Sequence, residues 1–363
     1  MEVVVVVVVV TALVFDFTNG FHDTANAMAT SIATGALPPR VAVGVSAVLN
    51  LVGAFLSIEV AQTISSGLVD ETRIGPAVVF GGLVGAVVWN LATWLLGLPS
   101  SSSHALFGGL IGATWVAAGS DAVRFTAVVE KVLVPAVASP LIAGLVAAVG
   151  TFVAYRLTRR ASTATRGFRY GQIASASLVS LAHGTNDAQK TMGVITLTLI
   201  TAGSLPAGAE PPLWVIVSAG LAISLGTWLG GWRIIQTMGR RITDVEPTQG
   251  FAAETGAAAV ILTSSQLGFA LSTTHVCAGG VVGSGVGKRL ADVRWTVAGR
   301  MAAAWVLTLP AAAVVGALAG ETAARGTAGV LVVAVIGVVV GAGAWILSRR
   351  NPVGAHNVRG ALS

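Results

Sequence analysis

Two stretches decide the fold: NGFHDTANAMA at Asn19–Ala29 and HGTNDAQKTMG at His183–Gly193. They align residue for residue at an offset of 164, and each places an aspartate, Asp23 or Asp187, well inside an apolar segment. A carboxylate at such a depth costs several kcal/mol unless it meets a cation, a proton or a set of donors. The duplicated aspartate therefore indicates a duplicated structural unit built around a polar site.

Two further pairs of segments repeat in the same order. Residues 51–70 align with 225–244 at an offset of 174, and share a Gln-Thr pair and a closing Asp. LGLPSSSSHALFGGLIG at 96–112 aligns with LGFALSTTHVCAGGVVG at 267–283 at an offset of 171. Three blocks in one order and at nearly constant offset predict that each half carries an Asp-motif helix, a second helix and a hairpin with a hydroxyl-rich tip.

The composition excludes a soluble globule. Only 10% of the 363 residues are charged, against about 25% in soluble domains, and 54% are apolar. The net charge of +6 is spread between apolar runs rather than gathered in one patch, which argues against nucleic acid as a partner. The single cysteine, Cys277, excludes a disulfide framework. The chain is expected to be a polytopic protein of the lipid bilayer.

The apolar runs predict an all-α architecture of about 10–12 transmembrane segments, since one crossing takes about 20 residues. Runs suited to one crossing lie at 41–58, 132–155, 211–232, 301–320 and 326–348, and a further stretch ends with 191–209. Two charge-free runs are longer, 47 residues at 74–120 and 33 residues at 255–287. The second divides into two arms of about 15 residues, a re-entrant length. Whether the 74–96 arm spans fully stays open.

The number of crossings between the two Asp motifs is odd whether a hairpin spans or re-enters, so the two repeats are expected to be inverted. Inverted repeats with broken helices are typical of secondary transporters, whose site lies at the membrane midplane. The expected organisation is repeat 1 at 1–120, a connecting helix and Arg-rich cytoplasmic loop at 121–170, repeat 2 at 171–290, and two C-terminal helices with a cytoplasmic tail at 291–363.

The basic residues predict the orientation. With the loop 156–170 in the cytoplasm, sixteen Lys and Arg fall on the inner side and four on the outer side. Cytoplasmic loops carry the excess of basic residues, so the N-terminus is expected outside and the C-terminus inside the cell membrane.

The two Asp motifs supply candidate ligands for a coupling ion. Asn26 lies about one helical turn after Asp23 on the same face. The helices are expected to unwind at Gly20 and Gly184, which would free backbone carbonyls. These carbonyls and the polar side chains of the motifs would supply the hard oxygen ligands that a small cation needs. The expected coupling-ion residues are His22, Asp23, Thr24, Asn26, Asn186 and Asp187, with Asp23, Asn26 and Asp187 as metal ligands only if the ion is sodium. The alternative is that each carboxylate only caps a broken helix.

The hairpin tips supply a candidate anion site. Ser or Thr at a helix start caps backbone N–H groups, and a helix N-terminus favours an anion. Two inverted hairpins would bring two such ends together around a small tetrahedral oxyanion. The candidate anion ligands are Ser101, Ser102, Ser103, Ser272, Thr273 and Thr274. The alternative is that these hydroxyls only satisfy a helix break.

The halves differ where Asn26 of the first becomes Lys190 of the second. A fixed ammonium in place of a second bound cation would favour proton over sodium coupling. It could equally pair with Asp187 or the anion, and the alternative is a lysine that reaches to the membrane interface. His22 could relay a proton, or be a simple hydrogen-bonded residue.

No enzyme signature is present. The sequence has no GxxxxGK[ST] nucleotide loop, no GxSxG nucleophile motif and no His/Cys cluster at metal-binding spacing. We expect neither an enzyme nor a cofactor other than the coupling ion.

These blocks resemble the inorganic phosphate transporter (Pit) family. The resemblance rests on NGFHDTANAMAT at Asn19–Thr30, HGTNDAQKTMG at His183–Gly193, PSSSSH at Pro99–His104 and LSTTH at Leu271–His275, and it covers nearly the whole chain. It implies a symporter of inorganic phosphate with a cation, working by alternating access. It carries the ion ligands onto Asp23, Asn26, Asn186 and Asp187, and the phosphate ligands onto the tip hydroxyls.

Two departures resemble the bacterial low-affinity branch of that family. His22-Asp23 stands where many sodium-coupled members have Asn-Asp, and the second motif carries Gln189-Lys190, which join the expected phosphate-binding set. The branch is proton-coupled and takes phosphate alone or as a metal–phosphate complex. Proton coupling is therefore favoured and sodium is the alternative. A sulfate symporter of the same fold and a passive anion channel are the alternative functions, and a homodimer is left open.

Overall fold

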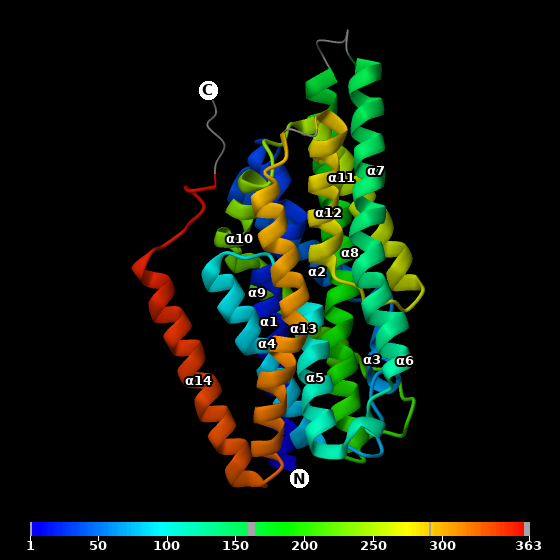
Figure 1. The fold of residues 1–363 in the computed structure, drawn as a ribbon, viewed down its shortest axis with the longest axis vertical. Helices are drawn as coiled ribbons and strands as arrows, with labels where there is room; N and C mark the ends of the chain where they lie inside the picture. Colours follow the sequence, from blue (N-terminus) through cyan, green and yellow to red (C-terminus); the bar gives the residue numbers. More distant parts are fainter. Residues whose placement is uncertain (1, 159–163, 290–291, 359–363) are drawn as a thin grey trace.

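The fold was analysed in a computed structural model that describes residues 2–158, 164–289 and 292–358. These residues form a bundle of helices, with an isolated two-residue β-bridge between Val69 and Val123 (Figure 1). The all-α architecture expected from the apolar runs is confirmed.

Helices make up most of the described chain. The first half holds α1 (Glu2–Ala33), α2 (Pro39–Gly53), α3 (Glu59–Gly67), α4 (Pro76–Leu96), α5 (Ser102–Ala118), η1 (Ser120–Ala122), α6 (Phe125–Val128), η2 (Val129–Leu133) and α7 (Val134–Thr158). The second holds α8 (Ala164–Thr201), α9 (Leu213–Leu229), α10 (Trp232–Gln236), η3 (Thr237–Arg241), α11 (Pro247–Gln266), α12 (Thr273–Lys288), α13 (Trp295–Ala323) and α14 (Thr327–Arg350).

Five helical stretches of the described chain are long and apolar enough to cross a membrane by themselves. They are Val3–Ala33, Pro76–Leu96, Phe125–Thr158, Trp295–Ala323 and Thr327–Arg350. A sixth is added if α9 and the helix after it, which are bent by 59° to one another, count as one span. The other segments needed to reach ten to twelve are shorter (α2, α3, α5, α12) or more polar (α8, α11). The chain is a multi-pass membrane protein.

The two long charge-free runs fold into helical hairpins, α4–α5 and α11–α12. Gly97, with φ +64°, ends α4 in the left-handed conformation that favours glycine. The second arms start at capped serines: Ser101 accepts from the backbone N–H of His104, and Ser272 from that of His275. Each hydroxyl-rich tip thus lies directly before the first turn of α5 or α12.

The expected unwinding at Gly20 and Gly184 is wrong. Helices α1 and α8 run unbroken through both Asp motifs. A Cβ on Gly20 would lie 2.2 Å from the carbonyl oxygen of Ile223, and one on Gly184 would lie 2.2 Å from that of Asn50. These glycines therefore permit close contact between helices. The interruptions lie in the second helix of each half, between α2 and α3 and between α9 and α10.

Replacing Gly20 by alanine is expected to lower the thermal stability of the purified protein, by about 1–3 kcal/mol, because the new methyl group meets backbone that cannot rotate away. Gly337→Ala in α14 is the matched control, since no atom lies within 4 Å of its added Cβ. Melting temperatures in one detergent would measure both. Equal melting temperatures for the two variants would contradict the close α1–α9 contact.

The helix contacts occur in matching pairs between the halves. Helix α5 packs on α13 as α12 packs on α7, α4 packs on α5 as α11 packs on α12, and α1 packs on α9 as α2 packs on α8. Helix α14 lies at the edge, against α4 and α13 (Figure 1). The N-terminus lies at one end of the bundle, whereas the last turn of α7 and the first turn of α8 lie at the other (Figure 1). Within the Arg-rich loop, residues 159–163 lie outside the described residues.

An ion pair at the Arg-rich end ties α11 to α12. Glu246 precedes α11, forms a capping box with Gln249, and lies 2.7 Å from the Lys288 ammonium. Partial burial opposes its ionisation, but hydrogen bonds from Lys288 and Tyr155 outweigh this and lower the pKa of Glu246. The pair holds the two arms of the second hairpin together outside the membrane-spanning part.

Candidate functional site

The two Asp motifs meet in the middle of the bundle. Asp23 of α1 and Asp187 of α8 are both buried, and each has a carboxylate oxygen within 4.8 Å of the other and of a ring nitrogen of His183. Two carboxylates at this separation repel one another unless a cation or a proton lies between or beside them. The sequence positions 164 residues apart thus form one site.

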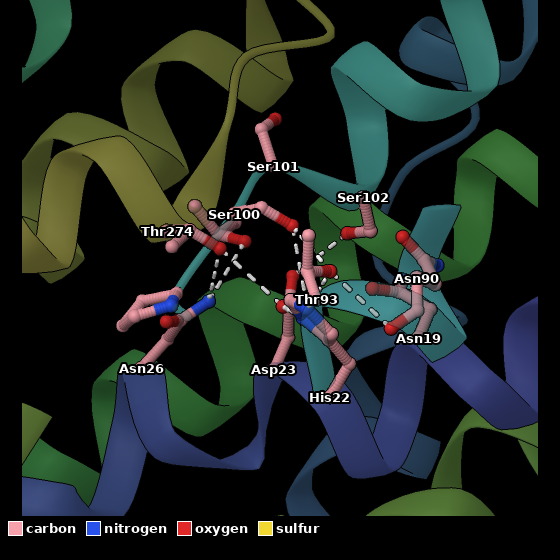
Figure 2. Close-up of polar contacts among 12 residues, drawn as sticks. Asn19, His22, Asp23, Asn26, Asn90, Thr93, Ser100, Ser101, Ser102 and Thr274 are labelled. Atoms are coloured by element: carbon pink, nitrogen blue, oxygen red, sulfur yellow. Dashed lines mark hydrogen bonds and ion pairs between the residues drawn. The ribbon is translucent and has the colours of Figure 1, made fainter. Parts of the chain in front are cut away.

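Asp23 is held by both hairpin tips (Figure 2). Ser102 at the start of α5 donates to Oδ2 at 2.8 Å, and Thr274 at the start of α12 donates to Oδ1 at 3.3 Å. His22 Nδ1 lies 2.6 Å from Oδ1 of the same carboxylate. Groups from three helices therefore surround this one carboxylate.

His22 and Thr24 take different directions. His22 Nε2 lies 3.2 Å from the Thr93 hydroxyl and 3.4 Å from that of Ser100, so the imidazole joins Asp23 to a small hydroxyl cluster (Figure 2). The Thr24 hydroxyl instead donates to the backbone carbonyl of Gly20 at 2.6 Å. It is turned away from both carboxylates.

Asn26 joins α1 to the second tip (Figure 2). Its Nδ2 donates to the hydroxyls of Thr274 at 3.0 Å and Thr273 at 3.4 Å. Its Oδ1 is buried and has no hydrogen-bond partner among the described residues. An unsatisfied amide oxygen at this depth is available to a cation or to a donor on a ligand.

Asp187 is paired with Lys190. The ammonium lies 2.6 Å from Oδ1, while Asn19 Nδ2 donates to Oδ2 at 3.2 Å. The Thr273 hydroxyl also donates to Oδ2, at 3.3 Å, and His183 Nε2 lies 3.3 Å away. This carboxylate has a fixed cation beside it, which Asp23 does not.

Lys190 does not reach for the membrane interface. Its side chain is fully buried, and its ammonium contacts the hydroxyl of Ser103 at 2.5 Å as well as Asp187. It therefore bridges α8 to the first tip, at the position equivalent to Asn26 in the other half.

The two tips contact one another beside the carboxylates. The Ser103 hydroxyl donates to the backbone carbonyl of Leu271 at 3.2 Å, so the N-termini of α5 and α12 converge. Each helix N-terminus carries about half a positive charge and exposes free N–H groups. The hydroxyls of the two tips are all buried within this region.

Besides Thr24, two more of the expected site residues point elsewhere. The Gln189 carboxamide oxygen accepts from the backbone N–H groups of Val60 and Ala61, so it caps the first turn of α3. The Asn186 Nδ2 donates to Ser265 of α11 at 2.9 Å, and its Oδ1 has no partner among the described residues. In this structure neither side chain contacts the paired carboxylates.

Three residues near the site went unrecognised in the sequence: Asp16, His183 and Glu254. Asp16 lies in the apolar run of α1, a position that by itself signals function.

Glu254 lies directly before the charge-free run 255–287. Its carboxylate accepts from the hydroxyls of Thr30, Ser31 and Ser175 at 2.5–2.8 Å and from Gln172 at 3.3 Å. A small cavity is lined in part by Asn26, Thr30, Glu254 and Cys277.

The polar groups of the site are suited to bind a small cation and an anion together. Carboxylate, hydroxyl and amide oxygens are the ligands that hard cations prefer, and the Asp23–His183–Asp187 group could hold one ion. An anion at the tips would meet Lys190 and two helix N-termini, but also two carboxylates.

Comparison with known proteins gives consistent results. The model of the family described as "Phosphate transporter family" matches residues 19–316. The chain is 58% identical over 357 residues to a "Probable low-affinity inorganic phosphate transporter" of Mycobacterium bovis, covering 97% of this chain and 86% of that protein. A protein of the same description from Bacillus subtilis is 41% identical over 325 residues, 87% of this chain and 96% of the other.

One solved structure has the same fold. "The sodium-dependent phosphate transporter" superposes with a TM-score of 0.73 at 22% identity, over 87% of this chain and 98% of that chain. At this identity the likeness concerns the fold alone.

Proposed function

The chain belongs to the phosphate transporter family, and on that premise we propose that it is a secondary active transporter that carries inorganic phosphate across the cell membrane together with a cation. The relatives and the shared fold are those of transporters and not of enzymes. The single observation that carries the proposal is the meeting of two capped helix N-termini and Lys190 at a pair of carboxylates.

The phosphate would bind between the two tips. Support comes from the convergence of α5 and α12 at Lys190, which supplies donors and positive charge for the oxyanion. The carboxylates favour phosphate over sulfate, because monohydrogen phosphate has a P–OH that needs an acceptor and sulfate has none. The proposed ligands are the tip hydroxyls and Lys190; Gln189 is left out because it caps α3.

Coupling would follow from charge. A phosphate placed beside Asp23 and Asp187 would be repelled unless one or both carboxylates received a proton or a cation. Binding of the anion and of the co-ion then favour each other, and the coupling is reciprocal. A passive channel would need no such dependence.

The proton is the proposed co-ion. The Lys190 ammonium, 2.6 Å from Asp187, occupies the place that a second cation would take, which leaves one carboxylate, Asp23, without a fixed positive partner. Sodium is the alternative, with Asp23, Asn26 and Asp187 as its ligands, and the structural neighbour is by its title sodium-dependent. Phosphate carried as a metal complex, and a homodimer, stay predictions.

The two halves are proposed to be inverted repeats that move against one another, with the N-terminus outside and the C-terminus in the cytoplasm. The paired helix contacts support the repeat, and the separation of the N-terminus from the last turn of α7 and the first turn of α8, which flank the Arg-rich loop, supports the orientation (Figure 1). Alternating access around a fixed central site is the expected mechanism for such a fold.

Uptake of radiolabelled phosphate into proteoliposomes tests the proposal. A proton gradient alone is expected to drive accumulation against the phosphate gradient, and unlabelled phosphate should compete far better than sulfate. If accumulation requires sodium, sodium and not the proton is the co-ion. Transport that equilibrates without ever accumulating would make the protein a channel, and uptake of sulfate in place of phosphate would change the substrate. Liposomes without protein are the control.

A further inference from the structure

Asp16 is the buried acid of the bundle that no contact accounts for. It lies on α1 seven residues before Asp23, which places it on the same helix face and about 10 Å away along the axis. Its side chain is fully buried, and neither carboxyl oxygen has a hydrogen-bond partner among the described residues. Asn19 and Thr191 lie near the carboxyl group without forming a well-aligned bond.

The other buried acids of the site are stabilised in ways that Asp16 is not. Asp187 has the Lys190 ammonium, and Asp23 has two hydroxyl donors and an imidazole. The charged groups that act on Asp16 are Asp187 and Lys190, both from α8, and Lys190 is already bound to Asp187. An ionised Asp16 would therefore be an unpaired charge in the membrane interior, which costs several kcal/mol.

The two repeats differ in sequence at both Asp16 and Lys190. At the offset of 164, the counterpart of Asp16 is Ser180, just as the counterpart of Lys190 is Asn26. Ser180 is satisfied, since its hydroxyl donates to Ser46 and to the Ala176 carbonyl. The extra acid and the extra ammonium are close enough to interact electrostatically, although no ion pair joins them. An acid that is not locked in an ion pair can gain and lose a proton, and the nearby ammonium is affected by its charge.

Resting on the proposed proton-coupled transport, we propose that Asp16 carries one of the transported protons, in addition to the group at Asp23. Asn19 connects it to the site, because Asn19 lies one turn further along α1 and donates to Asp187 at 3.2 Å. A proton on Asp16 removes one negative charge from the surroundings of Lys190. The Lys190 ammonium then attracts an incoming phosphate more strongly. Because the coupling is reciprocal, a bound phosphate favours protonation of Asp16.

The test is the thermodynamic stoichiometry of transport. With a gradient of about one pH unit, each coupled proton contributes about a tenfold accumulation of phosphate, since one pH unit is a factor of ten in proton activity. The accumulation reached at equilibrium by Asp16→Asn should therefore be about tenfold lower than that of the wild type. Exchange of labelled for unlabelled phosphate without a gradient should continue, and Asp16→Glu should restore the wild-type accumulation.

Thr196→Val is the matched control, because Thr196 is a buried residue of α8 whose hydroxyl also has no partner among the described residues. It should accumulate phosphate as the wild type does. Wild-type accumulation in Asp16→Asn would overturn the role of Asp16 and leave the proposed function standing. Loss of exchange together with a lowered melting temperature would make Asp16 a structural residue. Sodium-driven accumulation in the wild type would overturn the proton coupling itself.

Discussion

Asp23→Asn should abolish gradient-driven phosphate accumulation, by at least about 100-fold, in a protein that still folds. Asparagine keeps the size of the side chain and one acceptor oxygen for Ser102 or Thr274, which are the contacts that hold α1 to the two tips. It removes the negative charge that draws the co-ion. The measurement is initial uptake into proteoliposomes with an imposed proton gradient.

The control for this variant is Asp121→Asn, which removes a carboxylate from an exposed position outside the site. Its uptake should equal that of the wild type, and both variants should melt as the wild type does. Accumulation by Asp23→Asn at the wild-type level would show that this carboxylate holds no co-ion. In that case Asp23 would serve only to fasten the tips.

Lys190→Met is expected to destabilise the protein by about 3–5 kcal/mol and to eliminate transport, because it leaves Asp187 as a buried charge without its partner. Both side chains are fully buried, so water cannot replace the ammonium. Adding Asp187→Asn to the same chain removes the orphaned charge. The double variant should recover most of the stability, measured by thermal or denaturant unfolding, and none of the transport.

A double variant no more stable than Lys190→Met would contradict the pairing of these two residues. Lys190→Asn tests the further claim that the ammonium stands in place of a cation, since it restores the residue of the first half. Sodium in the medium should stimulate phosphate uptake by this variant and not by the wild type. Stimulation of both alike would mean that sodium sites exist beside Lys190.

Much of this architecture follows from local features of the chain. The tips were predictable because a Ser or Thr run before a helical arm caps backbone N–H groups wherever it occurs, and Ser101 and Ser272 do so. The hairpins followed from the lengths of the charge-free runs. Unwinding at Gly20 was wrong because glycine serves close helix contact as well as helix breaks, and a chain seen alone does not reveal a neighbouring helix.

The relations across the site depended on tertiary packing. Repeated motifs and burial identified Asp23, Asp187 and Lys190, since a charge within an apolar run is costly whatever surrounds it. The pairing of Lys190 with Asp187 was one of the sequence-based options, because the two residues lie one turn apart on α8. Their partners on other helices could not be deduced, because those contacts join residues 87 to 251 positions apart whose distance is set by how whole helices pack. Packing decided that Lys190 also contacts Ser103, that Gln189 caps α3, and that Asp16 remains unpaired. The type and position of a residue in the sequence show that a buried polar group requires a partner, whereas the tertiary packing of the helices determines which partner it has.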